Sequence, residues 1–387
     1  MNSLQEITVP KTMMVARLHA IGSPMRIDEI PVPDPRPTDV LVEVKACGVV
    51  PNMRRVIGNY FGTNTSDPKL FPPLPAIFGL DPVGIIAKLG DQVTGVRLGD
   101  RVYVNPARAC GSCRMCRAGM TLDCPDFSFQ GYFGRSRKIM SSYPYGGFSQ
   151  FITAPATALV ELPHNVSFED AARLGYLGTA YGALKKLGVG PGSRLLINGL
   201  TGTLGICAAM LALAMGVSRI LGVARNPVLL DRARGLAPER IHVYSMRQES
   251  IEADTSDPLV RWSRELTQGQ GVDAVVDCLP PGAPSLMLKR AILCLRRGGH
   301  AVNVGAVTEP LELDTFWMMT NRISLTGSVW FTTAEGEEIV SMAASKILEL
   351  TPLDHRIFPL SAINEALASM DNNLDGGFAN YIIDPKA

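Results

Sequence analysis

The sequence predicts an α/β protein of two domains, in which a partly open β-barrel precedes a doubly wound parallel sheet. Three observations support this fold. The chain has 387 residues, and chains of this length usually form more than one domain, each with its own hydrophobic core. Up to about residue 160, short β-type runs are broken by Pro and Gly, whereas strands and helices alternate from about residue 170.

The barrel-like region contains apolar and β-branched runs separated by turn sequences. Turns such as "LGDQ" and "RLGD" interrupt the apolar pattern before a helix could form. The runs expected to form strands are "DVLVEVKACGVV" (39–50), "VGIIAKLG" (83–90) and "DRVYVNPA" (100–107).

The second region alternates between strand and helix patterns with short links between them. Such alternation predicts a parallel sheet covered by helices on both faces. A last apolar run, "ANYIIDP" (379–385), is a candidate strand to return to the first domain. The expected strands are 193–199, 218–224, 272–280 and 300–307, and the expected helices are 203–216, 226–236, 334–350 and 361–370.

Composition narrows the class of protein. The chain is 46% hydrophobic and 19% charged with a formal net charge of +1, so it lacks the basic excess that nucleic acid or anionic membranes require. The N-terminal stretch has no signal-peptide layout, and no apolar run reaches the roughly eighteen residues that span a bilayer. We therefore expect a cytoplasmic enzyme for a small-molecule substrate, with no nucleic-acid or membrane partner.

Four of the eight cysteines cluster in the pattern C-x2-C-x2-C-x7-C. This spacing is typical of a metal site and not of a disulfide framework. Four thiolates complete a tetrahedral zinc and leave no position for substrate, so one structural zinc per chain is predicted. Free cysteines are the alternative, and they would leave a polar loop with little to order it. The predicted ligands are Cys110, Cys113, Cys116 and Cys124.

The stretch "LLINGLTGTLGICAAMLALAMG" (195–216) joins an apolar strand, a glycine-rich turn and a helix. A dinucleotide pyrophosphate can bind at such a turn, because glycines permit close approach and the helix N-terminus offers free N–H groups. The glycine spacing also fits a plain strand-to-helix turn, but the order of the surrounding elements favours a cofactor. The expected cofactor-binding residues are Gly199, Thr201, Gly202, Thr203, Leu204 and Gly205.

The second strand of this region ends in "RILGVARNP". Chains that bind NAD usually place an acidic residue at this strand end, but Ala224 stands here and is followed by Arg225 and Asn226. A guanidinium can bind the 2′-phosphate of NADP through paired hydrogen bonds, so NADP(H) is favoured. The alternative is that Arg225 is merely solvated.

These motifs resemble those of the medium-chain dehydrogenase/reductases of the zinc alcohol dehydrogenase superfamily over essentially the whole chain. The four clustered cysteines match the structural-zinc ligands of that family. The resemblance implies a cleft between the domains, and homodimers or homotetramers formed through the cofactor domains. It also implies a GroES-like catalytic domain with a zinc lobe (1–175), a Rossmann NADP-binding domain (176–325) and a return to the catalytic domain (326–387).

The residues that hold a catalytic zinc in this family are missing. The family pattern places Val50, Leu80 and Gly175, or a neighbour of Gly175, at the three ligand positions. None of these side chains can donate electrons to zinc. We expect the structural metal to be kept, the catalytic metal to be lost, and these positions to form an apolar wall for a flat conjugated substrate.

The proton relay of the family is altered as well. Asn52 replaces a Ser or Thr at the start of the relay, and Asp81 replaces a Glu behind the metal. We predict Asn52, Asp81 and Tyr176 as the catalytic donors, although each has a purely structural alternative. The segment 129–148, rich in aromatic and basic residues, either rims the substrate entrance or is a surface loop or oligomer contact.

Loss of the zinc indicates which chemistry is retained. Reduction of a simple ketone builds an alkoxide that zinc would stabilise, whereas hydride addition to an α,β-unsaturated carbonyl spreads charge over an enolate that hydrogen-bond donors can stabilise. Zinc-free enone and quinone reductases of the superfamily are similar in this respect. We therefore expect NADP(H)-dependent reduction of a conjugated C=C or an iminium. The alternatives are a zinc-independent carbonyl reductase or alcohol dehydrogenase, a non-redox hydrolase or lyase, and a non-catalytic cofactor sensor.

Overall fold

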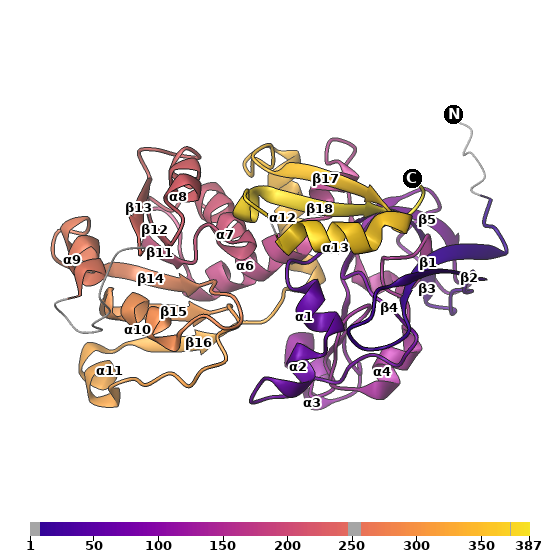
Figure 1. Ribbon diagram of the computed structural model, residues 1–387, viewed down its shortest axis with the longest axis horizontal. Coiled ribbons are helices and arrows are strands. Elements are labelled where there is room, and N and C mark those ends of the chain that lie inside the picture. Colours follow the sequence, from indigo (N-terminus) through magenta and orange to yellow (C-terminus); the bar gives the residue numbers. More distant parts are fainter. Residues whose placement is uncertain (1–7, 247–256, 372) are drawn as a thin grey trace.

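The computed structural model of the protein describes residues 8–246, 257–371 and 373–387. A β-barrel half formed mainly by the N-terminal residues lies beside a half built on a parallel sheet, and the C-terminal strands lie over the barrel half (Figure 1). This arrangement confirms the predicted fold class.

The barrel half is built around a seven-stranded sheet of order β10-β6-β5-β3-β18-β17, in which β9 also pairs with β3. Strand β3 is buried along almost its whole length, because neighbours cover it on both edges and both faces. A three-stranded sheet, β2-β1-β4, and a two-stranded one, β7-β8, complete this half. The strands are β1 (Thr12–Leu18), β2 (Arg26–Pro31), β3 (Asp39–Gly48), β4 (Ala76–Ile77), β5 (Asp81–Leu89), β6 (Arg101–Val104), β7 (Ala107–Arg108), β8 (Ser128–Phe129), β9 (Phe151–Pro155) and β10 (Leu159–Glu161).

Short helices connect these strands. The first two lie at the side of the barrel that faces the other half (Figure 1). The helices are α1 (Met53–Ile57), α2 (Tyr60–Thr63), α3 (Arg114–Arg117), α4 (Arg137–Ser142) and α5 (Phe168–Ala171), with 3-10 turns η1 (Thr121–Asp123) and η2 (Ala156–Ala158).

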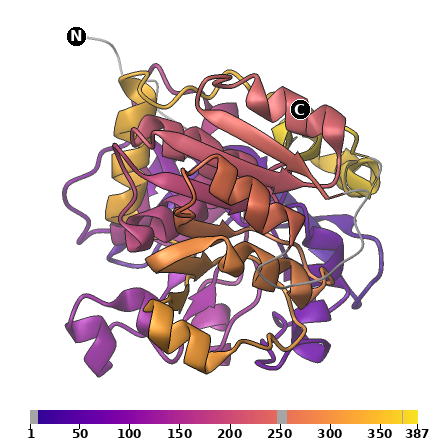
Figure 2. The same cartoon turned by 90° about the vertical axis from the view of Figure 1, so that its left-hand side faces the viewer.

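The other half contains a six-stranded parallel sheet of order β13-β12-β11-β14-β15-β16. Alternate residues of its strands enter different cores: Leu195 packs with α6 and α7, whereas Leu196 packs with α9 and α10. Figure 2, which faces this half, shows helices on both sides of the sheet. The strands are β11 (Arg194–Asn198), β12 (Arg219–Ala224), β13 (Ile241–Ser245), β14 (Val272–Asp277), β15 (Leu295–Asn303) and β16 (Ser324–Gly327).

Helix α6 joins the two halves. It spans Leu174–Leu187, so the domain boundary expected after residue 175 falls within its first turn. Strand β16 belongs to the parallel sheet and ends at Gly327, two residues past the other expected boundary. The remaining helices of this half are α7 (Thr203–Ala214), α8 (Pro227–Arg234), α9 (Pro258–Glu265), α10 (Ser285–Leu293) and α11 (Thr315–Asn321).

The C-terminal segment returns to the barrel. Strand β18 pairs antiparallel with β3 through Ile382 and Ile383, and parallel with β17 on its other side. The last strand therefore closes the main sheet of the first half. The elements of this segment are α12 (Thr333–Ala344), β17 (Asp354–Pro359), η3 (Leu360–Ala362), α13 (Ile363–Asp371), η4 (Gly376–Phe378) and β18 (Ala379–Asp384).

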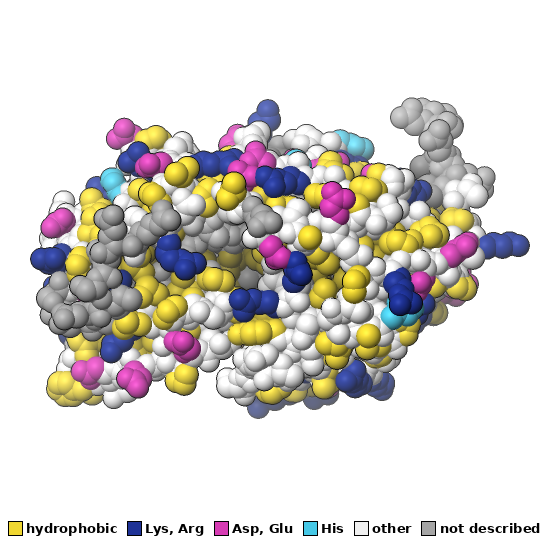
Figure 3. Space-filling view, viewed as in Figure 1, with side chains coloured by type: hydrophobic (Ala, Val, Ile, Leu, Met, Phe, Trp, Pro, Cys, Tyr) yellow, Lys and Arg dark blue, Asp and Glu magenta, His cyan; other side chains and the backbone are white. Residues whose placement is uncertain are grey.

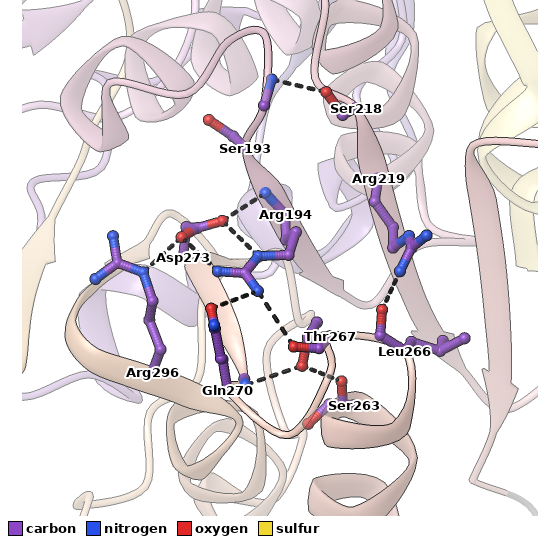
Figure 4. A network of polar contacts seen from close by, with 12 residues as sticks. Ser193, Arg194, Ser218, Arg219, Ser263, Leu266, Thr267, Gln270, Asp273 and Arg296 are labelled. Carbon is purple, nitrogen blue, oxygen red and sulfur yellow. Dashed lines mark hydrogen bonds and ion pairs between the residues drawn. The ribbon is translucent and has the colours of Figure 1, made fainter.

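A polar network holds the amino ends of the parallel strands together (Figure 4). Asp273 on β14 accepts hydrogen bonds from Arg194 on β11 at 3.0 Å and from Arg296 on β15 at 2.5 Å. Burial alone would raise the pKa of Asp273, but these hydrogen bonds outweigh it and lower the pKa to about 2. This end of the sheet is thereby fixed, and the opposite, carboxyl end is left for a ligand.

Positive and negative side chains are interspersed on the face drawn in Figure 3, in keeping with the small net charge. The surface is indented where the two halves meet (Figure 3). Within the described residues, no helix combines the length and the apolar character needed to cross a membrane.

Candidate active site and metal centre

The predicted cofactor turn connects the carboxyl end of β11 to the first residue of α7. Gly199 adopts a φ of +86°, which favours glycine, and a Cβ on Gly205 would lie 2.2 Å from the Gly199 carbonyl oxygen. Gly202 precedes the helix without any side-chain cap. The first N–H groups of α7 are therefore available to an anion, and the turn fits the pyrophosphate of a dinucleotide.

The end of β12 carries the residues predicted to select the cofactor. Arg225 is exposed and makes no ion pair with any described residue. Asn226 instead uses its side-chain oxygen to cap α8, accepting hydrogen bonds from the backbone of Val228 at 3.0 Å and of Leu229 at 3.3 Å. Arg225 is thus free to bind a phosphate, whereas one end of the Asn226 amide is already engaged.

A buried polar pair lies next to this turn and did not figure among the predicted site residues. Asn198, the last residue of β11, donates to Asp277 at the end of β14 over 2.6 Å. Burial raises the pKa of Asp277 to about 7, and its second carboxyl oxygen has no partner among the described residues. Asp277 lies within the predicted strand 272–280, but nothing in the sequence indicated that it would face Asn198.

The C-terminal segment contacts the cofactor turn directly. The backbone N–H of Gly377 donates to the carbonyl of Thr201 at 2.8 Å, and a Cβ on Gly377 would lie 2.3 Å from the Gly202 carbonyl oxygen. Only a glycine permits this approach. The turn η4 therefore supports the cofactor turn from the side of the barrel half.

The four clustered cysteines form a metal-ligand set. Their Sγ atoms all lie within 4.8 Å of one another, and the Cys110–Cys116 and Cys113–Cys124 pairs are 4.0 Å apart. Tetrahedral zinc thiolates place sulfurs roughly 3.8 Å apart, given a Zn–S bond of about 2.3 Å. Backbone N–H groups of the loop also point to these sulfurs. The loop fits a structural zinc, which would hold the lobe together and offer no open position to a substrate.

The positions expected for catalytic-zinc ligands lie in one buried region. Val50 is 2% exposed and Leu80 is 4% exposed, and Gly175 lies in the first turn of α6. Within the described parts of the chain, the cysteine cluster is the one group of three or more side chains able to share a metal ion.

Val50, Leu80 and Gly175 are accompanied by a polar group, the carboxyl group of Asp81. A Cβ on Gly175 would lie only 2.0 Å from Oδ1 of Asp81, so a carboxyl group fills the space in front of this glycine. The family resemblance implied that Asp81 and Gly175 lie near the same site, but it did not indicate how closely they approach. The buried region around Val50, Leu80 and Gly175 therefore combines apolar residues with one buried carboxyl group, that of Asp81.

Asp81 is 2% exposed and accepts a hydrogen bond from the hydroxyl of Tyr103 at 2.8 Å. Burial raises the pKa of Asp81 to about 7, although Tyr103, the charge of Arg173 and the backbone N–H of Gly175 all lower it. The predicted donor Tyr176 is half-buried, and its pKa is raised by burial and by the nearby Asp81. Asp81 and Tyr176 therefore lie near each other, and the Asp81 carboxyl group is buried beneath the solvent-accessible surface.

Asn52, the third predicted donor, precedes helix α1 but does not cap it. Its side-chain oxygen accepts a hydrogen bond from the hydroxyl of Tyr132 at 2.6 Å. Tyr132 lies in the segment 129–148, for which a rim of the entrance and a surface loop or oligomer contact were both open, and no individual role was predicted for it. Its ring also lines a cavity of about 170 Å³ formed by prolines 72, 73, 75 and 144, and by Tyr143 and Tyr145.

Replacing Asp81 by Asn should remove a pH-dependent cost of burying a carboxylate. The pKa of Asp81 is about 7 in the folded chain against an ordinary value of 3.8, so the folded state holds this proton more tightly and its stability falls as pH rises from about 4 to 7. The free energy of unfolding of Asp81→Asn minus that of the parent should therefore increase by roughly 2 kcal/mol from pH 5 to pH 8. Urea denaturation of both proteins at each pH measures this difference.

The exposed Asp34 provides the control, because its side chain is 86% exposed and Asp34→Asn should show no such trend. An Asp81→Asn difference that stays constant with pH would mean that Asp81 is ionised in the fold throughout this range.

Comparison with known families agrees with this geometry. Residues 36–164 match the model of the alcohol dehydrogenase GroES-like domain, and residues 203–345 match that of zinc-binding dehydrogenases. An NAD-dependent alcohol dehydrogenase of Sulfurisphaera tokodaii is 28% identical over 93% of this chain and 97% of that protein. A sorbitol dehydrogenase of Bacillus subtilis is 27% identical over 83% of each.

Solved structures show the same fold. A Sinorhizobium meliloti protein crystallised with NADP superposes with a TM-score of 0.80 over 97% of this chain and 100% of that chain, at 20% sequence identity. The matched models, the relatives and the shared fold agree with one another over both halves. The chain belongs to the medium-chain dehydrogenase/reductase superfamily of the zinc alcohol dehydrogenase type, and it is an oxidoreductase.

Proposed function

We propose that this protein is an NADP(H)-dependent reductase without a catalytic zinc, and that it reduces a C=C bond conjugated to a carbonyl, or an iminium, in a small molecule. The observation that carries this proposal is the state of the metal-ligand positions. Val50 and Leu80 offer no donor atom, and the space in front of Gly175 is taken by the Asp81 carboxyl group. A zinc ion would have no ligand set here.

The conjugated substrate follows from where negative charge can be stabilised. Bound NADPH supplies a hydride, and one proton completes the reduction as NADP⁺ is formed. Addition at the β-carbon delocalises the charge onto the carbonyl oxygen, so neutral hydrogen-bond donors can stabilise it. Asn52 and Tyr176 are the proposed donors, whereas Asp81 acts from behind the surface because it is buried and already bonded to Tyr103.

Preference for NADP(H) is supported by the residues after β12. Ala224 removes the carboxylate that would repel a 2′-phosphate, and Arg225 is exposed without an ion pair to any described residue. The Sinorhizobium protein binds NADP, whereas the Sulfurisphaera relative is NAD-dependent. The relatives therefore allow both cofactors, and the local chemistry decides our choice.

A zinc-independent carbonyl reductase or alcohol dehydrogenase is the second candidate. It is favoured by the relatives, which act as alcohol and sorbitol dehydrogenases. In this case the hydride would go to the carbonyl carbon, and the product would be an alcohol.

We further propose a homodimer built by pairing the β16 edges of two copies, with a homotetramer as the alternative. Strand β16 is the last strand of its sheet and has one neighbouring strand among the described residues. Exposed apolar side chains lie beside it, with Phe316 at 70%, Met319 at 65% and Val329 at 51% exposure. Sedimentation equilibrium would measure this assembly.

Metal analysis should find one zinc per chain. Cys113→Ser should lose this zinc and lower the unfolding midpoint, because the lobe depends on the metal for its order. Turnover by the folded fraction should change little, since the lobe zinc has no open position. Inductively coupled plasma mass spectrometry and thermal denaturation measure the two effects.

The buried Cys294 is the control for this experiment, because it lies outside the cluster and Cys294→Ser should retain one zinc. Two zinc ions per chain in the parent would contradict the loss of the catalytic site.

The parent protein should bind NADPH about 10- to 100-fold more tightly than NADH, as expected for hydrogen bonds to a charged group worth about 1.5–3 kcal/mol. The double variant Ala224→Asp, Arg225→Ala should reverse this preference, because it introduces a repulsive carboxylate and removes the cation. Fluorescence titration of both cofactors gives the ratio. Arg97→Ala, at another exposed arginine, should leave the ratio unchanged; equal affinities in the parent would show that Arg225 is only solvated.

The reaction itself is tested with NADPH deuterated at the transferred position and a panel of enones, aldehydes and ketones. We expect deuterium at the β-carbon of a saturated product, located by NMR. Label found only on carbinol carbons would favour the second candidate. Firm NADPH binding without transfer to any compound would favour a non-redox enzyme.

A further inference from the structure

We propose that Tyr132 is a positioning residue that holds the Asn52 side chain so that its amide N–H group donates to the carbonyl oxygen of the substrate. This inference rests on the proposed function and assigns the group that takes over the electrophilic role of a metal. Its basis is the hydrogen bond of 2.6 Å between the Tyr132 hydroxyl and the Asn52 side chain.

The hydrogen bond shows which end of the amide faces Tyr132. The Tyr132 hydroxyl donates to Oδ1 of Asn52 over 2.6 Å. The amide nitrogen is then directed away from Tyr132, and it bonds to no other described residue.

The backbone of Asn52 leaves its side chain available for this role. The residue stands immediately before α1, where an Asn side chain usually caps the helix, yet it makes no capping hydrogen bond. It is half-buried next to the fully buried Val50 and Met53. A half-buried amide that neither caps its helix nor pairs its N–H group is placed to meet a ligand.

Tyr132 is itself held firmly. It is 5% exposed, and its ring packs against those of Phe133, at a centroid distance of 4.5 Å, and Phe129, at 6.2 Å. Burial raises the pKa of the Tyr132 hydroxyl well above its usual value, so the group remains a protonated donor at neutral pH. Tyr132 therefore orients Asn52 and does not give up its own proton.

Glycines bring the Tyr132 loop against the turn that carries Leu80 and Asp81. Gly131 has a φ of +67°, and a Cβ on it would lie 2.7 Å from the Gly79 carbonyl oxygen and 2.5 Å from the Gly146 Cα. No larger residue could keep this distance without displacing a backbone segment. The loop that carries Tyr132 therefore packs directly against the turn 79–81, where the zinc ligand of the family is absent. The Tyr132–Asn52 pair lies beside this turn.

The pair can stabilise the charge that develops during reduction. As the hydride bonds to the β-carbon, the C=C π electrons shift and the carbonyl oxygen becomes an enolate oxygen. The Asn52 N–H group hydrogen-bonds to that oxygen. Water then protonates the α-carbon. Fixed donors are more effective than mobile ones, because they require no reorganisation as charge develops. Without Tyr132 the amide could rotate and present Oδ1, which would repel the enolate.

The test uses Asn52→Ala, Tyr132→Phe and the double variant in the full-length protein, with the best substrate of the deuterium panel. Asn52→Ala should lower kcat by about 100- to 1,000-fold, as for loss of one oxyanion donor. Tyr132→Phe should lower kcat by about 10-fold with an unchanged NADPH dissociation constant, because the donor remains but is no longer fixed. The double variant should match Asn52→Ala, since Tyr132 acts through Asn52.

Tyr181→Phe is the matched control. It removes another largely buried tyrosine hydroxyl with a 2.6 Å hydrogen bond, to Glu338, but lies outside the site. It should lower the melting temperature and leave kcat unchanged. Near-UV circular dichroism and NADPH titration of every variant establish that it is folded.

The outcomes separate this inference from the proposed function. If the parent reduces C=C bonds but Asn52→Ala or Tyr132→Phe retains full kcat, the inference fails and the proposed function stands. A double variant showing the product of the two single losses also overturns it, because Tyr132 would then act independently. If label reaches only carbinol carbons, the proposed function fails; the inference then stands if Asn52→Ala and Tyr132→Phe lower carbonyl reduction by the same factors, and it fails if they do not. No transfer to any compound overturns both proposals.

Discussion

The close contact between the Asp81 carboxyl group and Gly175 is the constraint on which the candidate site depends. Asp81 begins β5, and Gly175 lies in the first turn of α6, the helix that leads into the cofactor-binding half. A Cβ at 175 would lie 2.0 Å from the carboxyl oxygen, so a larger residue at this position would require the Asp81 side chain to move. In the described structure the Asp81 carboxyl group occupies the space that a ligand side chain at 175 would need.

This contact is linked to the cofactor turn through Arg173. The buried Arg173 guanidinium lowers the pKa of Asp81 and donates to the carbonyl of Ala379, just after η4. The backbone N–H of Gly377, within η4, in turn bonds to Thr201 in the cofactor turn at 2.8 Å. The charge of Arg173 and these two hydrogen bonds therefore connect the buried acid, through the C-terminal segment, with the place proposed for the pyrophosphate, although no hydrogen bond or ion pair joins Arg173 to Asp81 among the described residues.

Sequence predicted what is encoded locally and missed what depends on tertiary contacts. The strand, turn and helix around Gly199 are consecutive, and four cysteines within one short loop can reach a common metal, so both could be recognised from spacing. The Tyr132–Asn52 pair joins residues 80 positions apart, and its register depends on glycine contacts between three loops. The family resemblance placed both Gly175 and Asp81 at this site, but the close approach of the carboxyl group to the glycine depends on how β5 and α6 pack and could not be read from the order of residues.

The polar groups around the turn 79–81, where the zinc ligand of the family is absent, have protonation states that suit one another. Val50 and Leu80 offer no zinc ligand, and burial raises the pKa of Asp81 to about 7 and that of Tyr132 well above its usual value. In the function that we propose, hydroxyls and an amide are the donors. A zinc ion stabilises a localised alkoxide by several kcal/mol. One fixed neutral donor contributes about 2.7–4 kcal/mol, which is better suited to an enolate whose charge is already shared between oxygen and carbon. The conjugated acceptor that we propose therefore agrees with the absence of metal-ligand side chains at Val50 and Leu80.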